Sequence, residues 1–465
     1  MGIRLDWEIE SETSGAHTAT EDPLVLRGRR RDRTRFILAF IGFVVAIGGV
    51  LLLGAWRLNE SDQNIEQRLR DTIDAEVAAL RVGDWNAFYS TQRSADPAWA
   101  DTTDAQQRVY FDDIQTQKAL GGVQLTGTVR ALLIDGSRGR AVVETIKDGA
   151  PYVQTWFYWR YSDGWRHVPP DYTFWGEPQQ YNGVRVTVRY LALDNAFARE
   201  AGIRVEGWIN DACTALLQCG DFPHVTLTVL TDDSLSDARW SADNPWLLEL
   251  PSPFMTQTRY DEPFTGALKQ SVAEVIAQRL VDEASSDPAE PTANSDAAYL
   301  RPAIVTWLVG RFMQLSTDSL LIDSVARNYG DEAIGRLLLA LTPDSQVAVV
   351  ADAAGVPSLG ELDVDWRGFL TWRLRLENTL FSQANENAYV ALYAPQFDTL
   401  ARGRYTTPLD PTLIPQGAVT QVIPDVGSEG TPQLEAVVFY TTPVGTQLEA
   451  RVLFRLVGQT WLRAN

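Results

Sequence analysis

The feature that most constrains this chain is an apolar stretch without charge, Phe36 to Trp56, which lies between Arg35 and Arg57. A helix of this length, at about 1.5 Å per residue, measures roughly 30 Å, the hydrocarbon thickness of a bilayer. Arginines crowd its N-terminal side, so the positive-inside rule predicts a cytoplasmic N-terminus. We therefore expect one transmembrane helix over 36–56, preceded by a disordered cytoplasmic tail over 1–35. The rest of the chain should then lie outside the cytoplasm, on a single-pass protein of a bacterial cell membrane.

The composition of the remaining chain indicates several folded domains. About 400 residues follow the apolar stretch, which is too many for one compact domain. The net charge of −20 argues against a nucleic-acid partner. The two cysteines, Cys213 and Cys219, form either a disulfide or two buried thiols. This pair alone offers too few ligands for a metal site.

Helical patterns precede strand patterns over residues 62–176. Apolar residues recur every three or four positions from Ile65 to Leu80, and the pattern then changes to strands after Gly121. Helices followed by a curled antiparallel sheet are typical of an α+β layout. The pattern resembles the NTF2-like (SnoaL-like) cone fold, which implies a pocket inside the curved sheet. Trp159 and Trp165 are candidates to line that pocket, with burial in the core as the alternative.

The last segment, 376–465, repeats this plan. Asn387 to Tyr393 echoes Asn86 to Tyr89, and the strand ending at Trp461 echoes the one at Trp165. We predict that it forms a second NTF2-like domain with the same fold as the first.

The segment between them, 181–375, mixes strands and helices. Its patterns predict strands and helices in alternation, with an amphipathic helix at about 268–283 and several helices after it. The stretches from Tyr329 to Leu338 and from Trp366 to Leu370 resemble the gluzincin metallopeptidases of the peptidase MA type. That resemblance implies a thermolysin-like pair of lobes with a cleft between them.

The residues that would hold zinc in such a peptidase are missing from this chain. Members of the family carry His-Glu-x-x-His on the amphipathic helix, where two histidines bind zinc and the glutamate is the general base. Here Ala273 and Ala277 stand at the histidine positions, and only Glu274 remains. The third ligand is replaced by Gly310. We therefore expect no zinc, no other cofactor and no peptidase activity, since a catalytic zinc needs three protein ligands.

These features favour a non-catalytic binding or scaffold protein, a pseudopeptidase that engages a peptide or protein ligand at the cell surface. Candidate binding residues are Trp307 and Arg311 in the middle segment, besides Trp159 and Trp165 in the first. We also expect Ala273 and Ala277 to face the cleft and Arg311 to pair with Glu274.

Two other functions stay open on the sequence. One is an enzyme with a site in an NTF2-like pocket, for which His167, Asp171 and Tyr172 form the nearest candidate cluster. The other is a transmembrane regulator that acts through its short basic cytoplasmic tail.

Overall fold

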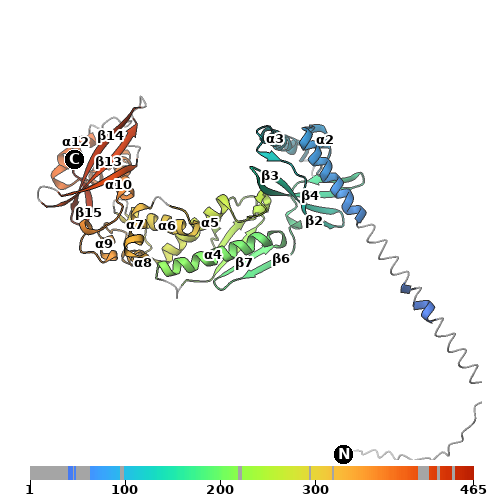
Figure 1. The fold of residues 1–465 in the computed structure, drawn as a ribbon, viewed down its shortest axis with the longest axis horizontal. Helices are drawn as coiled ribbons and strands as arrows, with labels where there is room; N and C mark the ends of the chain where they lie inside the picture. Colours follow the sequence, from blue (N-terminus) through green and yellow to red (C-terminus); the bar gives the residue numbers. More distant parts are fainter. Residues whose placement is uncertain are drawn as a thin grey trace, which may run out of the picture.

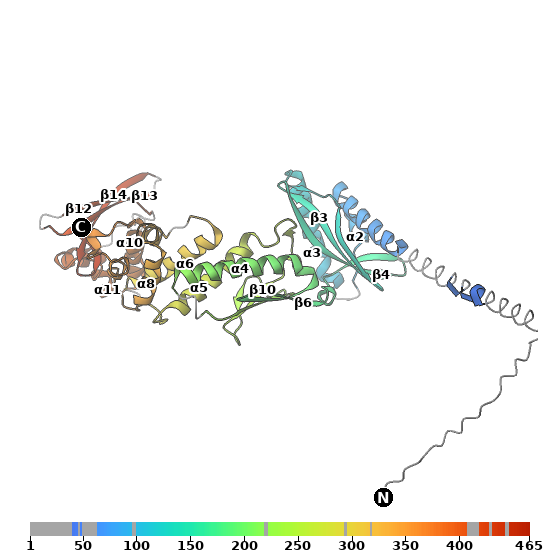
Figure 2. The same cartoon turned by 60° about the horizontal axis from the view of Figure 1, so that its bottom comes forward.

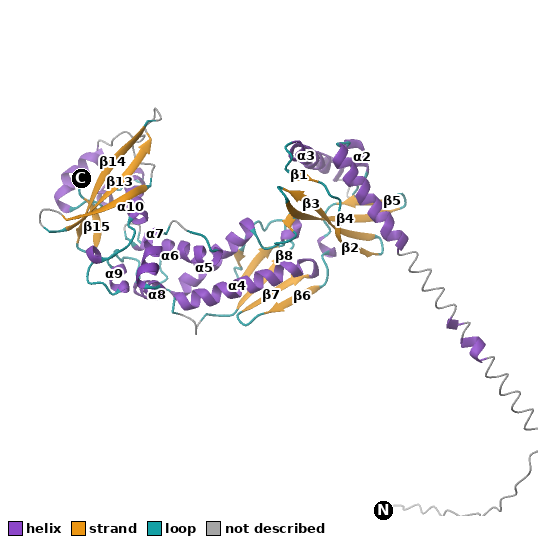
Figure 3. Cartoon of the chain, viewed as in Figure 1, coloured by secondary structure: helices purple, strands orange, loops and turns teal. Residues whose placement is uncertain are grey.

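The structure is a computed structural model that describes residues 40–44, 47–48, 63–94, 99–217, 222–292, 295–316, 319–406, 418–426, 430–441 and 446–465. The described chain forms three units in a row, and the N-terminal and C-terminal units lie at opposite ends of the middle unit (Figure 1). Both end units combine helices with an antiparallel sheet, whereas the middle unit has a sheet next to the N-terminal unit and helices next to the C-terminal one (Figures 2 and 3).

The N-terminal unit places helices on one face of a curved antiparallel sheet. A helix over residues 63–82 is followed by α2 and α3, and then by the strands. Strands β2 to β5 pair in sequence order, and β1 shares an edge of β3 with β2. The bounds are α2 Trp85–Ser90, α3 Trp99–Ala119, β1 Val123–Gln124, β2 Val129–Asp135, β3 Arg138–Lys147, β4 Ala150–Tyr161 and β5 Gly164–Val168.

Consecutive residues are buried in the middle of β3 and near the end of β4, so both faces of these strands are covered there. Trp156 and Tyr158 of β4 pack under the helices, whereas Phe157 points to the opposite face. On that face Phe157 stacks on Trp175 at a centroid distance of 5.7 Å. The N-terminal sheet therefore shares one of its faces with the core of the middle unit.

The middle unit has a five-stranded mixed sheet in the order β6-β7-β8-β10-β9. Strands β7, β8 and β10 are parallel, and α4 connects β7 to β8. The strands are β6 Pro178–Asn182, β7 Val186–Leu191, β8 Val225–Leu230, β9 Arg239–Trp240 and β10 Leu247–Pro251. The helices are α4 Asn195–Ala215, α5 Gly266–Ala284, α6 Ala297–Met313, α7 Leu320–Tyr329, α8 Asp331–Ala340 and α9 Val349–Ala354. A further strand from this segment, β11 Thr258–Arg259, pairs with β4 and so belongs to the N-terminal sheet.

The C-terminal unit is described here from α10 onward. The predicted boundary at 375/376, which stays a prediction, falls inside this helix. Three helices again precede a four-stranded antiparallel sheet in sequence order. The bounds are α10 Arg367–Ser382, α11 Glu386–Val390, α12 Asp398–Thr406, β12 Val419–Val426, β13 Pro432–Thr441, β14 Gln447–Val457 and β15 Thr460–Arg463.

The two end units share their order of elements and the register of their last hairpin. In the N-terminal unit Arg160 lies opposite Trp165 across β4 and β5. In the C-terminal unit Leu456 lies opposite Trp461 across β14 and β15. The assignment of both units to the NTF2-like family stays a prediction.

The predicted transmembrane helix is corrected by the structure. A bilayer span needs about 20 apolar residues. In the described part of the chain, no helix combines that length with sufficient apolar character. Of the stretch 36–56, the structure describes two short helical pieces, 40–44 and 47–48, and the other residues lie outside the described ones. The predictions of a single-pass membrane protein and of its cell-membrane location are therefore wrong on this finding. The predicted tail over 1–35 lies outside the described residues.

Candidate functional site

Helix α5 separates an apolar face from a polar one, and this decides what each side chain can reach. Ala273 and Ala277 are fully buried in the large core. Glu274 and Gln278, which also lie one turn apart, are exposed. The prediction that the alanines face the cleft is therefore wrong, because the core side of an amphipathic helix takes the small apolar residues.

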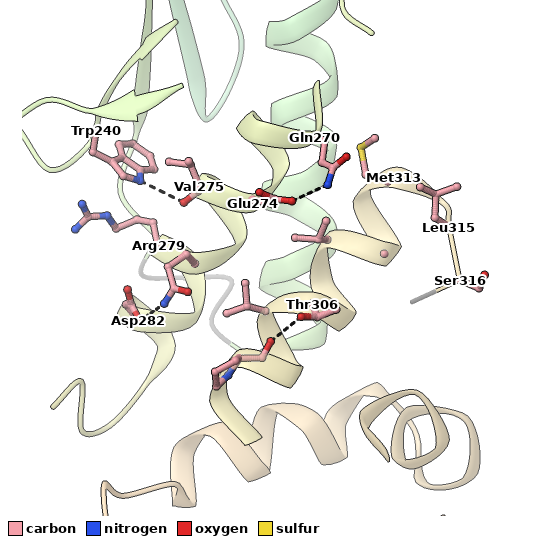
Figure 4. A pocket seen from close by; sticks show the side chains of 15 residues that line it. Trp240, Gln270, Glu274, Val275, Arg279, Asp282, Thr306, Met313, Leu315 and Ser316 are labelled. Carbon is pink, nitrogen blue, oxygen red and sulfur yellow. Dashed lines mark hydrogen bonds between the residues drawn. The ribbon is translucent and has the colours of Figure 1, made fainter. Parts of the chain in front are cut away.

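The polar face of α5 lines a cleft of about 910 Å³, which we call the α5/α6 cleft. Its second wall is α6, and Trp240 of β9 closes one end (Figure 4). Strand β9 lies at the edge of the five-stranded sheet, so the cleft runs beside a sheet edge. The Trp240 indole donates a hydrogen bond of 3.2 Å to the carbonyl of Val275, which fixes this edge strand to α5. Apolar side chains from both helices form much of the lining, namely Val275, Pro302, Val305, Val309 and Met313.

Two carboxylates lie on the α5 wall, two turns apart. Gln270 donates a hydrogen bond of 2.8 Å to Glu274, and Gln278 donates one of 2.8 Å to Asp282. Burial raises the pKa of Asp282 above its usual value, and the hydrogen bond from Gln278 opposes this. These bonds hold both acids in place along the cleft.

The one basic side chain among the lining residues is Arg279, which is stacked rather than paired with an acid. Its guanidinium lies 5.1 Å from the ring centroid of Trp240. This cation–π contact orients both groups at the β9 end of the cleft.

Gly310 and Arg311, which follow each other on α6, face different surfaces. Gly310 lines the α5/α6 cleft. Arg311 binds Asp211 at 2.8 Å and Asp331 at 2.5 Å. The predicted pair between Arg311 and Glu274 is therefore wrong. The hydrogen bond that Arg311 donates to Asp211 is the main reason that the pKa of Arg311 is raised.

The structure places Trp307 beneath Arg311 rather than in the cleft. Trp307 is buried, and the Arg311 guanidinium lies 5.1 Å from its ring centroid. The two predicted binding residues of α6 thus support each other and the adjoining ion pairs.

The described residues offer no ready metal site. Across the described ranges, no group of three or more His, Cys, Asp or Glu side chains is placed to hold an ion. The positions where the resemblance implies ligands carry two alanines and a glycine, and Glu274 stands where it implies the general base.

The candidate residues of the N-terminal unit do not gather at one site. Trp165 is buried, whereas Trp159 is 36% exposed. His167 binds Glu76 through Nδ1 at 2.7 Å. Asp171 caps Thr173 at 3.1 Å, and the Tyr172 hydroxyl donates to Asp233. Each of the three residues of the predicted cluster therefore has its own partner elsewhere.

Cys213, near the end of α4, is buried and disulfide-bonded. The other cysteine of the chain, Cys219, lies outside the described residues.

Most residues that line the cleft were not among the predicted site residues. Gln270, Glu274, Gln278 and Asp282 recur every four positions, and this spacing puts them on one helical face. This spacing could have predicted the polar face of α5. The prediction placed the cleft at Ala273 and Ala277 instead, because these align with zinc ligands of the family. Nothing in the sequence near Trp240 indicated that it reaches α5.

The chain was compared with protein families, with curated proteins and with solved structures. No protein-family model matches the chain, and no curated protein does. Among solved structures, native yeast LTA4 hydrolase matches with 15% identity and a TM-score of 0.22, over 50% of this chain and 33% of that one. At that TM-score the match carries no argument for the gluzincin resemblance, which stays a prediction. The chain spans a third of its length, and so low a score supports no conclusion about chemistry.

Proposed function

We propose that this chain is a non-catalytic binding protein whose α5/α6 cleft holds a peptide segment with apolar and basic side chains. The observation that carries the proposal is the combination of an apolar lining with two fixed carboxylates beside a sheet edge. Clefts of this kind and size, with a few placed polar groups, are the usual form of ligand sites.

The two carboxylates of the cleft favour a partner segment with basic side chains. Glu274 and Asp282 are eight residues apart on α5, which corresponds to roughly 12 Å along the helix. Arg279 is the one basic side chain among the lining residues, and it stacks on Trp240. Arg279 and the buried Arg301 offset part of the negative charge of Asp282. A segment with lysine or arginine side chains at that spacing would meet both acids, while its apolar side chains contact Val305 and Val309.

The edge strand offers a second mode of contact. Among the strands that the structure describes, β9 pairs with β10 alone, along one of its edges. An extended peptide can add to such an edge through main-chain hydrogen bonds, and its alternate side chains then point into the adjoining pocket. Trp240, which β9 carries, lies at the place where those side chains would arrive.

The direct test is the binding of a fluorescein-labelled peptide of alternating leucine and lysine to the full chain, followed by anisotropy. We expect binding, and we expect a peptide of alternating leucine and serine to bind less tightly. Thr306→Arg should lower the affinity about tenfold or more, because Thr306 is exposed on the α6 wall and a cation there repels the ligand.

A matched control is available on another helix. Thr379 of α10 is also exposed and also donates to the carbonyl four residues earlier, at 3.1 Å against 2.9 Å for Thr306. Thr379→Arg should leave the affinity unchanged. Equal affinity for both variants would contradict the proposed site. The non-catalytic character would be contradicted by one tightly held zinc per chain together with peptide cleavage that chelation abolishes.

A further inference from the structure

The two end units correspond residue by residue around a buried glutamate. Glu76 and Gln92 are sixteen positions apart, as are Glu377 and Tyr393. Gln92 forms a parallel bridge with His167, and Tyr393 forms one with Arg463. Each glutamate contacts the basic side chain of that last strand, Glu76 the imidazole of His167 at 2.7 Å and Glu377 the guanidinium of Arg463 at 2.6 Å. These contacts and the shared hairpin register align the two end units. Each surface residue of one unit can therefore be matched to a position in the other.

In the C-terminal unit, the surface between the first helix and the last hairpin is covered by the middle unit. Thr460 at the hairpin and Arg373 on α10 both bind the carboxylate of Asp296, at 2.7 and 2.6 Å. The Gln459 carbonyl accepts a hydrogen bond of 3.0 Å from the amide of Ala348. In the C-terminal unit this surface therefore docks the middle unit, and the acidic side chain of Asp296 is part of the contact.

In the N-terminal unit, the equivalent surface is an open groove of about 460 Å³. It is lined by Arg68 and Thr72 of the first helix and by Arg160 and Gly164 of the hairpin. These stand at the positions of Phe369, Arg373, Leu456 and Thr460 in the other unit. An arginine thus replaces an apolar residue on each side of the groove.

The two replacing arginines lack acidic partners in the described part of the chain. Asp163 at the rim is already bound by Arg166 at 3.0 Å and Arg93 at 3.3 Å. Asp71 accepts a hydrogen bond of 2.8 Å from Gln67. Arg68 and Arg160 line the groove without a described ion pair, although the chain has 60 acidic residues against 40 basic ones.

We propose that this groove is a docking surface for an acidic segment of a partner protein. Arg68 and Arg160 would bind its carboxylates from the two sides of the groove, as Arg373 and Thr460 bind Asp296 in the other unit. Guanidinium groups suit this role because they bind carboxylates through two hydrogen bonds. The buried Trp165, whose ring centroid lies 6.0 Å from the Arg160 guanidinium, forms the floor.

The experiment uses the full chain and a fluorescein-labelled peptide of alternating aspartate and alanine, with anisotropy as the readout. We expect binding that weakens about tenfold or more between about 50 and about 500 mM NaCl, because salt screens exposed charges. The double variant Arg68→Glu/Arg160→Glu should abolish binding. Thr306→Arg, which changes the α5/α6 cleft, should leave it unchanged, so the two sites are tested separately.

The control variant Arg70→Glu/Arg402→Glu carries the same change in net charge. Arg402 is exposed and Arg70 is half-buried, and neither lines the groove. We expect it to bind as the wild type does, with the same circular dichroism as the groove variant. Absent binding, an equal loss in both double variants, or equal affinity for an asparagine-alanine peptide would overturn the proposal. Displacement by inorganic phosphate at the concentration of the peptide would also overturn it, because the groove would then be a small-anion site.

Discussion

Thr460, at the start of β15, donates a hydrogen bond of 2.7 Å to the fully buried carboxylate of Asp296 at the start of α6. Arg373 of α10 binds the same carboxylate at 2.6 Å and is itself buried. Burial raises the pKa of Asp296 and lowers the pKa of Arg373, and the attraction between them opposes both shifts. The C-terminal unit is therefore joined to the middle unit by a buried ion pair.

Asp296→Ala should lower the free energy of unfolding by about 3–5 kcal/mol, because it leaves the Arg373 cation buried without its partner. Urea unfolding followed by tryptophan fluorescence measures this. Asp112→Ala, at an exposed i,i+4 pair on α3, is the control and should change the value by less than about 0.5 kcal/mol. A similar small change for Asp296→Ala would show that the pair does not hold the units together.

Asp194 should make stability fall as the pH rises. Its carboxylate is buried and accepts hydrogen bonds from Trp175 and Ser252, and burial raises its pKa from 3.8 to about 6. The folded chain keeps this proton where the unfolded chain has lost it. The contribution is therefore full below about pH 4 and is lost as the pH rises through about 6, by roughly 3 kcal/mol.

Unfolding by urea at several pH values between about 4 and 8 tests this dependence on Asp194. Asp194→Asn does not titrate and should have a flatter profile than the wild type. It keeps the shape and accepts from Trp175, and its amide nitrogen donates to the Ser252 hydroxyl in place of accepting from it. Parallel profiles for the two proteins would contradict the assignment to Asp194.

Ala273→His/Ala277→His should destabilise the chain and should not create a zinc site. Both alanines are fully buried, so two imidazoles would overpack the core at a cost of about 1–3 kcal/mol each. Gln278→His on the exposed face of the same helix is the control and should be nearly neutral. The measurements are the thermal unfolding midpoint and zinc content, and a stable double variant with one bound zinc would contradict the orientation of α5.

Glu76→Ala should destabilise the N-terminal unit by about 3 kcal/mol, because it leaves buried donors without an acceptor. Tyr158 donates to Glu76 at 3.0 Å and Gln92 at 2.9 Å, besides the contact with His167. Glu66→Ala, at an exposed pair on the same helix, should cost less than about 1 kcal/mol. Hydrogen exchange of the helix over 63–82 locates the effect, and equal protection in both variants would contradict it.

The regular elements could be predicted from periodicity, whereas the contacts that build the cleft could not. The range of α5 followed from its apolar repeat, because a core-facing helix must repeat at that period. Strands β9 and β11 have two residues each, too few for any pattern. Arg311 binds Asp211, a hundred positions earlier, and no local rule indicates such a partner.

The predicted end of the middle segment at 375 falls inside α10 for a related reason. Helix α10 continues through Arg373 and Glu377, buried charges that look like surface residues in the sequence. Only their partners, Asp296 and Arg463, explain why they lie inside.

One apolar core runs from Val142 in the N-terminal sheet through the middle unit to Trp461 in the C-terminal sheet. Close-packed interiors of this kind deform little, so they hold distant surfaces at a set spacing. The groove lined by Arg68 and Arg160 and the α5/α6 cleft are therefore held at a constant distance from each other. A partner that carries an acidic and a basic segment gains avidity only when its own linker matches the distance between them.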